Sequence, residues 1–214
     1  MGYYGSMFGL GQKEESLLRE LSTPRSIQDF LDRLAMNHEK RGETYQSPRL
    51  VLKTRKAHCM EGALLAAAAL WLQGQPPLLM DFRTTPLDED HVVALYRVNG
   101  YWGAISKTNH AILRFRDPVY RTLRELALSY FHEYFDFKTG EKTLREYSKP
   151  FALRKLGAGW ITAESDLHWI AQAVDDSRHY PLVPARNLRH LRPADRMELA
   201  GGKVIEWPKT DPRT

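Results

Sequence analysis

Residues 58–73 read HCMEGALLAAAALWLQ and contain the longest apolar run of the chain, from Ala63 to Leu72. The apolar side chains of this run cover every face of a helix, and a helix of that kind is buried on all sides. The stretch therefore predicts the central helix of a domain, ended by Gly74 and the prolines that follow it. The run is about half of the ~20 residues that a membrane span needs, so no membrane association is expected.

Three strand patterns follow the helix in close succession. They are residues 78–83 (LLMDFR), 91–98 (HVVALYRV) and 101–106 (YWGAIS), with a weaker candidate at 110–115. Asn99-Gly100 is a strong signal for a two-residue hairpin turn, which pairs positions whose numbers sum to about 199. Asp117-Pro118 is expected to open a helix from residue 119 to about 135. A helix, an antiparallel meander and a second helix, in this order, predict an α+β fold.

Outward from this core, the patterns are weaker. Thr23-Pro24 marks the start of a helix over residues 26–36, after a shorter helix over 14–21. Residues 37–57 are polar and loop-like. The remaining expectations are a strand at 151–156, a helix at 163–174 and a short strand at 203–207. We therefore predict a helical lead-in over 1–37, a core over 38–137 and an extension over 138–214 that packs on the core.

The composition is that of a globular protein with a sizeable core. The chain has 214 residues, of which 43% are hydrophobic and 27% charged. Cys59 is the single cysteine, so an intramolecular disulfide and a Cys-based zinc site are both excluded. We expect a cytoplasmic protein with no metal or organic cofactor. The N-terminus fits the loose Met-Gly-x-x-x-Ser pattern for myristoylation at Gly2, but chance explains so short a match better.

The net charge of +5 is unevenly distributed. Residues 38–57 hold six basic residues against Glu39 and Glu43. The basic residues are Lys40, Arg41, Arg49, Lys53, Arg55 and Lys56. Such a stretch is either a solvated loop or a patch for an acidic partner. No nucleic-acid-binding motif accompanies it, so nucleic acid is not the favoured partner.

Cys59 lies at the predicted start of the central helix, where free backbone N–H groups and the helix dipole favour a thiolate. Basic side chains at 53, 55 and 56 and the imidazole of His58 are expected to add to this effect. No good N-cap residue directly precedes the cysteine, which would leave the first N–H groups free for an oxyanion. The alternative is that Cys59 is an unreactive, buried side chain that behaves as a small hydrophobic residue. A nucleophilic cysteine needs a histidine base, and His91 opens a strand 32 residues later.

The segments HCMEGALLAAAAL, DEDHVVALYRVNGYW and the following AIS, in this order, resemble the transglutaminase-like cysteine superfamily. The resemblance covers about residues 50–137. It implies a papain-like core in which Cys59 is the nucleophile and His91 the base. In that family, the next strand usually reads Trp, three residues, then Asp. Here Ser106 stands in the place of the acid, and Asn109 is the second candidate for orienting His91.

The favoured function is a cysteine-dependent acyl transferase or amide hydrolase that acts through a thioester. Its partner would be a peptide or other amide substrate in a cleft between Cys59 and His91. Because Ser106 brings no charge, a second reading stays open: a catalytically degenerate domain that binds a peptide or protein partner. The third possible function is that of a nucleic-acid-binding protein that uses the basic residues 38–57. The sequence does not indicate the acyl substrate or the oligomeric state.

Overall fold

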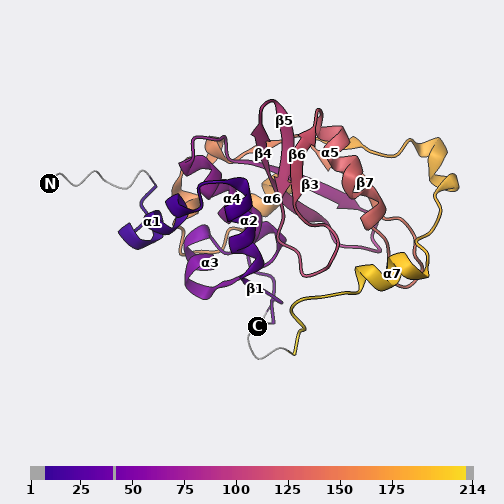
Figure 1. The fold of residues 1–214 in the computed structure, drawn as a ribbon, viewed down its shortest axis with the longest axis horizontal. Coiled ribbons are helices and arrows are strands. Elements are labelled where there is room, and N and C mark those ends of the chain that lie inside the picture. Colours follow the sequence, from indigo (N-terminus) through magenta and orange to yellow (C-terminus); the bar gives the residue numbers. More distant parts are fainter. Residues whose placement is uncertain (1–7, 41, 211–214) are drawn as a thin grey trace.

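The computed structural model describes residues 8–40 and 42–210, so the Gly2 pattern lies outside the described residues. Figure 1 shows a mixed α+β fold in which an antiparallel sheet is flanked by helices. The helices are α1 (Gln12–Glu20), α2 (Pro24–Asp32), α3 (Pro48–Thr54), α4 (Cys59–Leu72), α5 (Leu123–Tyr130), α6 (His168–Asp175) and α7 (Arg196–Gly202). Short 3₁₀ helices lie at Phe131–Glu133, Leu153–Leu156, Gly159–Ile161 and Ala185–His190.

The main sheet has the strand order β6-β5-β4-β3-β7-β9, and β8 also pairs with β3. The strands are β3 (Leu78–Thr84), β4 (His91–Val98), β5 (Tyr101–Ile105), β6 (Arg116–Tyr120), β7 (Leu144–Ser148), β8 (Phe151–Ala152) and β9 (His179–Pro181). A separate parallel pair joins β1 (Ala35–Met36) to β2 (Lys56–Ala57). Because β7, β8 and β9 belong to the main sheet, that sheet extends across the boundary expected at 137/138.

Helix α4 is the centre of the fold, as its sequence predicts. All of its residues are buried except Cys59 and Trp71, and the four alanines from 66 to 69 are fully inaccessible. The helix packs on β4 and is surrounded by α1, α2 and α3 (Figure 1). An element enclosed in this way holds its first residue, Cys59, in a fixed place at the edge of the core.

The two faces of β4 serve two different hydrophobic cores. Val92, Ala94 and Tyr96 pack with α4, whereas Val93 and Leu95 pack with α5 on the opposite face. This alternation follows from the two-residue period of a strand. It explains why the sequence of β4 is apolar at successive positions. The sheet is therefore the middle layer of three.

The predicted hairpin between β4 and β5 is confirmed. Asn99 and Gly100 both have positive φ, 49° and 86°, as a type I′ turn requires. Val98 pairs with Tyr101 and Ala94 with Ile105, so the paired numbers sum to 199. This register brings the start of β4 beside the residues that follow β5.

The expected helix start at Asp117-Pro118 is wrong. Both residues lie in β6, and α5 begins only at Leu123, with the Thr122 side chain accepting the N–H of Glu125 at 3.1 Å. β6 is an edge strand of the sheet. An edge position leaves one side of the strand unpaired, so it tolerates the missing N–H of proline.

Other elements also differ from the sequence-based expectation. Residues 110–115 form no strand beyond an isolated bridge at His110, and only Phe151–Ala152 of the strand expected at 151–156 is a strand. Residues 37–57, expected to be a loop, contain α3, which is capped by Ser47 and begins with Pro48. In the C-terminal region, α7 precedes the expected strand at 203–207, where Ile205 forms an isolated bridge with His110. In the part of the chain that the structure describes, no helix is both long and apolar enough to cross a membrane.

Candidate functional site

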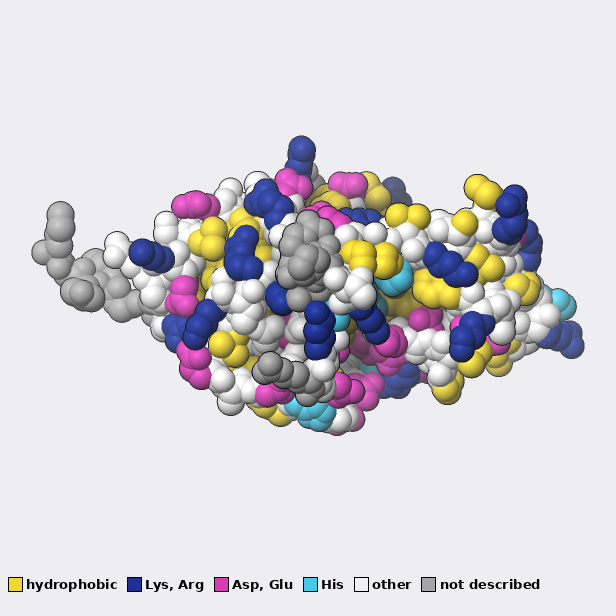
Figure 2. Space-filling model, turned by 90° about the horizontal axis from the view of Figure 1, so that it is seen from below, with side chains coloured by type: hydrophobic (Ala, Val, Ile, Leu, Met, Phe, Trp, Pro, Cys, Tyr) yellow, Lys and Arg dark blue, Asp and Glu magenta, His cyan; other side chains and the backbone are white. Residues whose placement is uncertain are grey.

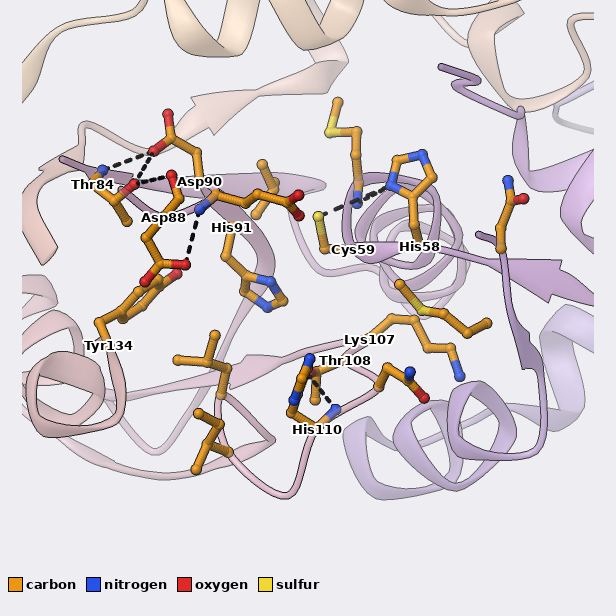
Figure 3. A pocket seen from close by; sticks show the side chains of 18 of the residues that line it. His58, Cys59, Thr84, Asp88, Asp90, His91, Lys107, Thr108, His110 and Tyr134 are labelled. Atoms are coloured by element: carbon orange, nitrogen blue, oxygen red, sulfur yellow. Dashed lines mark hydrogen bonds between the residues drawn. The ribbon is translucent and has the colours of Figure 1, made fainter. Parts of the chain in front are cut away.

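A cavity of about 1090 Å³ opens at the N-terminal end of α4 (Figure 3). Cys59 and His91 both line it. Its remaining walls come from the loop before β4, from residues 107–113 and from the C-terminal segment around Trp207. The packing of α4 against β4 is what brings the cysteine and the histidine to one space.

Cys59 is half-buried at the first position of α4. Its Sγ lies 3.9 Å from Nδ1 of His58, and it also interacts with the ring of His91. Burial raises the pKa of a thiol, but hydrogen bonds from His58 and His91 and the positive charge of these rings outweigh burial and lower the pKa of Cys59 to about 5. A thiolate is therefore the dominant form of Cys59 at neutral pH.

His91, the first residue of β4, is held by a chain of two hydrogen bonds. Its Nε2 lies 2.8 Å from Oγ of Ser106, and this hydroxyl donates to the carbonyl oxygen of Leu113 at 2.5 Å. A carbonyl only accepts, so the serine proton is committed to Leu113 and the serine oxygen accepts from Nε2–H of His91. In the neutral ring, this tautomer leaves Nδ1 of His91 without a proton.

The acceptor at the end of this chain is itself fixed in place. Leu113 has a φ of 59°, which a leucine rarely adopts. Its N–H donates to the carboxylate of Glu133 at 2.6 Å, and Arg116 pairs with the same carboxylate at 2.6 Å. The strained peptide is thus anchored by an ion pair, and it holds the Ser106 hydroxyl in one orientation.

Asn109 lies apart from this chain. Its side chain accepts the N–H of Trp207 at 2.8 Å and donates to the carbonyl of Trp207 at 2.9 Å. The structure thus brings together three of the four candidate residues, Cys59, His91 and Ser106. The fourth, Asn109, binds the backbone of Trp207 and so holds the C-terminal segment against the wall of the cavity.

His58 lies directly beside Cys59, where the sequence predicts that it adds positive charge, but its second role, as the cap of the helix, is not expected from the sequence. It is the N-cap of α4: its Nδ1 accepts the N–H of Met60 at 3.3 Å, and its Nε2 donates to the carbonyl of Thr44 at 2.6 Å. The expectation that no good cap precedes Cys59 is therefore wrong. Glu61 completes the capping box, as its spacing indicates, by accepting the N–H of His58 at 3.0 Å.

The charge state of His58 is set by its neighbours. Burial lowers the pKa of an imidazole, yet the hydrogen bond to Cys59 and the negative charges of Cys59 and Glu61 outweigh it, and the pKa of His58 rises. Glu61 is fully buried, and one of its oxygens lies 3.5 Å from Nε2 of His58. In its charged form His58 therefore lies between the thiolate and the buried carboxylate, and its Nδ1 proton faces Sγ of Cys59. The bond that Nδ1 accepts from the N–H of Met60 belongs to the neutral ring.

The basic side chains at 53, 55 and 56 do not lie in the cavity. Among the described residues that line it, Lys53, Arg55 and Lys56 are absent. Arg55 stacks over the ring of Phe30 at 4.7 Å, and Lys53 and Arg55 are exposed. The positive charge next to the thiol comes from two imidazoles instead.

Lys107 also lines the cavity, in the polar segment that follows β5. It is almost completely buried, and its Nζ donates to the carbonyl of Leu34 at 2.5 Å. Burial lowers its pKa to about 8. Its stem lies directly against Gly62 of α4, where a Cβ would overlap the Cβ of Lys107. The glycine is therefore required for the close approach of the two segments.

Three carboxylates on one wall of the cavity are spaced closely enough to hold a metal ion. Asp81, Asp90 and Asp175 each offer an oxygen, and these oxygens lie within 4.8 Å of one another. Two of them already have basic partners: Asp81 lies 2.9 Å from Nε2 of His179, and Asp175 lies 2.9 Å from Arg83. Only Asp90 retains an unpaired charge, which does not fit a divalent cation site.

The sequence matches no protein-family model, and the search of curated proteins found none similar to it. The chemistry of this site is therefore inferred from the contacts of Cys59, His91 and Ser106. These contacts join an acidic thiol, a base with a defined tautomer and a fixed acceptor for the proton of that base.

Proposed function

We propose that the protein is a transglutaminase-like cysteine enzyme that hydrolyses an amide or transfers its acyl group through a thioester. The observation that supports this proposal is the position of His91: it lines the same cavity as Cys59, its charge lowers the pKa of the thiol, and its Nε2 lies 2.8 Å from the Ser106 hydroxyl. A cysteine, a histidine base and a group that orients the base are what thiol-based acyl transfer requires.

In the first half of the reaction, the Cys59 thiolate attacks the carbonyl carbon of the amide and forms a C–S bond. The carbonyl oxygen becomes an oxyanion, for which the first backbone N–H group of α4, that of Cys59, is the available donor. The N–H of Met60 faces Nδ1 of His58, which accepts it only while that ring is neutral. Protonated His91 gives its Nδ1 proton to the leaving nitrogen as the C–N bond breaks, which leaves a thioester.

In the second half, water or an amine attacks the thioester carbon. Nδ1 of His91 takes the proton of the attacking group, and the Cys59 thiolate leaves. Ser106 accepts from Nε2–H throughout, because its own proton is held by Leu113. Ser106 orients the ring but brings no charge to the imidazolium, so its contribution is one of positioning.

The test is trapping of the acyl-enzyme. Incubation with p-nitrophenyl acetate should release p-nitrophenolate and add one acetyl group at Cys59, read by intact mass and peptide mapping. Cys59→Ala should abolish the adduct, and His91→Ala should slow its formation at least about tenfold. His110→Asn is the matched control, because His110 lines the same cavity but bonds to Gly202.

The alternative is a degenerate domain that binds a peptide in the same cavity. The neutral hydroxyl of Ser106 in the place of an acid favours it. In that case Cys59 reacts with a small alkylating agent but accumulates no acetyl-enzyme, which would overturn the enzymatic proposal. A peptide that then protects Cys59 from alkylation would identify a binding module.

A further inference from the structure

The wall of the cavity next to His91 is strongly acidic, although the protein as a whole is basic. Among the described residues, eight acidic side chains and two lysines line the cavity, against a net charge of +5 for the chain. Figure 2 shows Asp and Glu side chains gathered near histidines around the middle of one face. The potential inside the cavity is therefore opposite in sign to the net charge.

Much of this acidic charge has no protein cation beside it. Asp81, Asp175 and Glu133 are paired with His179, Arg83 and Arg116. In contrast, Asp88, Glu89 and Asp90, which directly precede His91, form no ion pair with any residue of 8–40 or 42–210.

The hydrogen bonds of this loop fix its carboxylates without neutralising them. Asp88 accepts from the hydroxyl of Thr143 at 2.5 Å, and Asp90 accepts from the N–H of Thr84 at 2.7 Å. Burial raises the pKa of Asp88 and that of Asp90, and neighbouring carboxylates raise both further. Mutual repulsion of this kind is relieved when a cation enters.

A buried hydroxyl without a partner lies in the same wall. Tyr134 is 1% exposed, and its Oη has no hydrogen-bond partner among the described residues. Figure 3 shows its ring directed toward Asp88, on the side of the cavity that holds His91. Burial and the charges of Cys59, Asp81 and Asp88 raise its pKa, so the group is a neutral phenol whose oxygen can accept an N–H.

We propose that the segment Asp88–Asp90 and Tyr134 form a subsite for a positively charged nitrogen group of the substrate, an ammonium or a guanidinium. The carboxylates attract the group, and the phenol oxygen accepts one of its N–H bonds. The subsite lies beside His91, so the group belongs to the part of the substrate next to the reacting carbonyl. The proposal rests on the proposed function only in taking the ligand to be a substrate of Cys59.

Charged thiol reagents test the potential at Cys59 without any need for catalysis. The cationic trimethylammonium-ethyl, the anionic sulfonato-ethyl and the neutral methyl methanethiosulfonates each form a mixed disulfide with the thiolate and release methanesulfinate. At low salt, the cation-to-anion rate ratio at Cys59 should exceed the ratio for 2-mercaptoethanol at least about tenfold. It should fall several-fold in Glu89→Gln/Asp90→Asn, with the neutral reagent unaffected.

Asp29→Asn is the matched control for charge removal, since Asp29 is an exposed acid of α2 that does not line the cavity. It should leave the rate ratio unchanged. A wild-type ratio equal to that of 2-mercaptoethanol overturns the proposal. Failure of the proposed function would give a different result: Cys59 would react with these reagents but form no acetyl-enzyme with p-nitrophenyl acetate.

Protection of Cys59 from the neutral reagent identifies the source of the cation. Acetyl-lysine amide, acetyl-arginine amide and spermidine represent peptide side chains and a free polyamine, and acetyl-glutamine amide is the neutral counterpart. At least one cationic ligand should slow modification at concentrations where the neutral one does not, and Tyr134→Phe should weaken this protection. Protection by Ca²⁺ alone, or by none of these cations, overturns the proposal.

Discussion

Nε2 of His91 lies 2.8 Å from Oγ of Ser106, and the proton of that serine is already committed to the carbonyl of Leu113. The hydroxyl therefore acts only as an acceptor toward His91. The carbonyl of Leu113 thus determines the tautomer of His91, although it contacts His91 only through the Ser106 hydroxyl. An aspartate at this position would meet the Leu113 carbonyl at close range, which explains how a serine fits here.

Replacement of Ser106 should show whether its hydroxyl orients the ring of His91 or only fills space beside it. Ser106→Ala removes the acceptor of Nε2–H and leaves the Leu113 carbonyl unpaired, at a cost of about 1–3 kcal/mol. Alkylation of Cys59 by iodoacetamide should slow about tenfold at neutral pH. Ser106→Thr retains the hydroxyl and serves as the control. Equal rates for the alanine and threonine variants would show that this contact does not orient His91.

The pH dependence of alkylation should report an acidic thiol. The pKa of Cys59 is lowered to about 5, so the thiolate is present above that pH and is lost as the pH falls through it. The iodoacetamide rate should be flat from pH 6.5 to 8 and fall with a midpoint near 5. A midpoint near the ordinary thiol value of about 8.5 would contradict the two-histidine environment.

His58 has two roles that a pair of variants can separate. Asparagine is a good N-cap, so His58→Asn should keep α4 capped while removing the imidazole beside the thiolate. The midpoint of alkylation should move upward by about one pH unit, with little change in Tm. His58→Ala loses both the cap and the ring, and its Tm should fall as well. An unchanged midpoint in both variants would assign the low thiol pKa to His91 alone.

The basic residues at 53, 55 and 56 should have no influence on the thiol. Lys53→Gln/Arg55→Gln/Lys56→Gln removes three charges that do not line the cavity. Salt screens exposed charges over about 8 Å at physiological ionic strength, so the midpoint of alkylation should stay where it is. A rise in the midpoint would restore the expectation, drawn from sequence alone, that this stretch activates Cys59.

Gly62 should tolerate no side chain. Its added Cβ would overlap Lys107 in the core, and overpacking of this kind costs about 1–3 kcal/mol, seen as a lower Tm for Gly62→Ala. Gly201→Ala is the matched control, because Gly201 is also helical and has no neighbour within 4 Å of an added Cβ. That variant should be neutral or slightly more stable. A similar Tm for both variants would show that Lys107 moves aside freely.

The parts of the fold that the sequence predicts are those with a local cause. The apolar run of α4 and the Asn99-Gly100 turn specify a buried helix and a hairpin register through neighbouring residues. The register in turn places Ser106 near His91. In contrast, Pro118 indicates a helix start by local rules, and only its place on the edge strand β6 shows why it lies in a strand.

The parts of the site that the sequence does not predict depend on contacts between distant segments. Asn109 is as suitable an acceptor as Ser106 by spacing, but it is engaged by Trp207, 98 residues away. His58 is not a usual cap residue. Its ring is held in the capping position by the carbonyl of Thr44, which lies 14 residues earlier in the chain. The orphaned hydroxyl of Tyr134 carries no motif at all.

The enclosure of α4 has a consequence for how the site loses its order on heating. Amides in a helix buried on every face exchange with solvent only through global unfolding, so those of residues 63–70 should be among the slowest to exchange. His91 is held instead through the irregular segment that contains Leu113, which has a strained backbone. Local opening of that segment would release His91 while Cys59 stays fixed at the start of α4. Thermal inactivation should then precede the loss of helical circular dichroism.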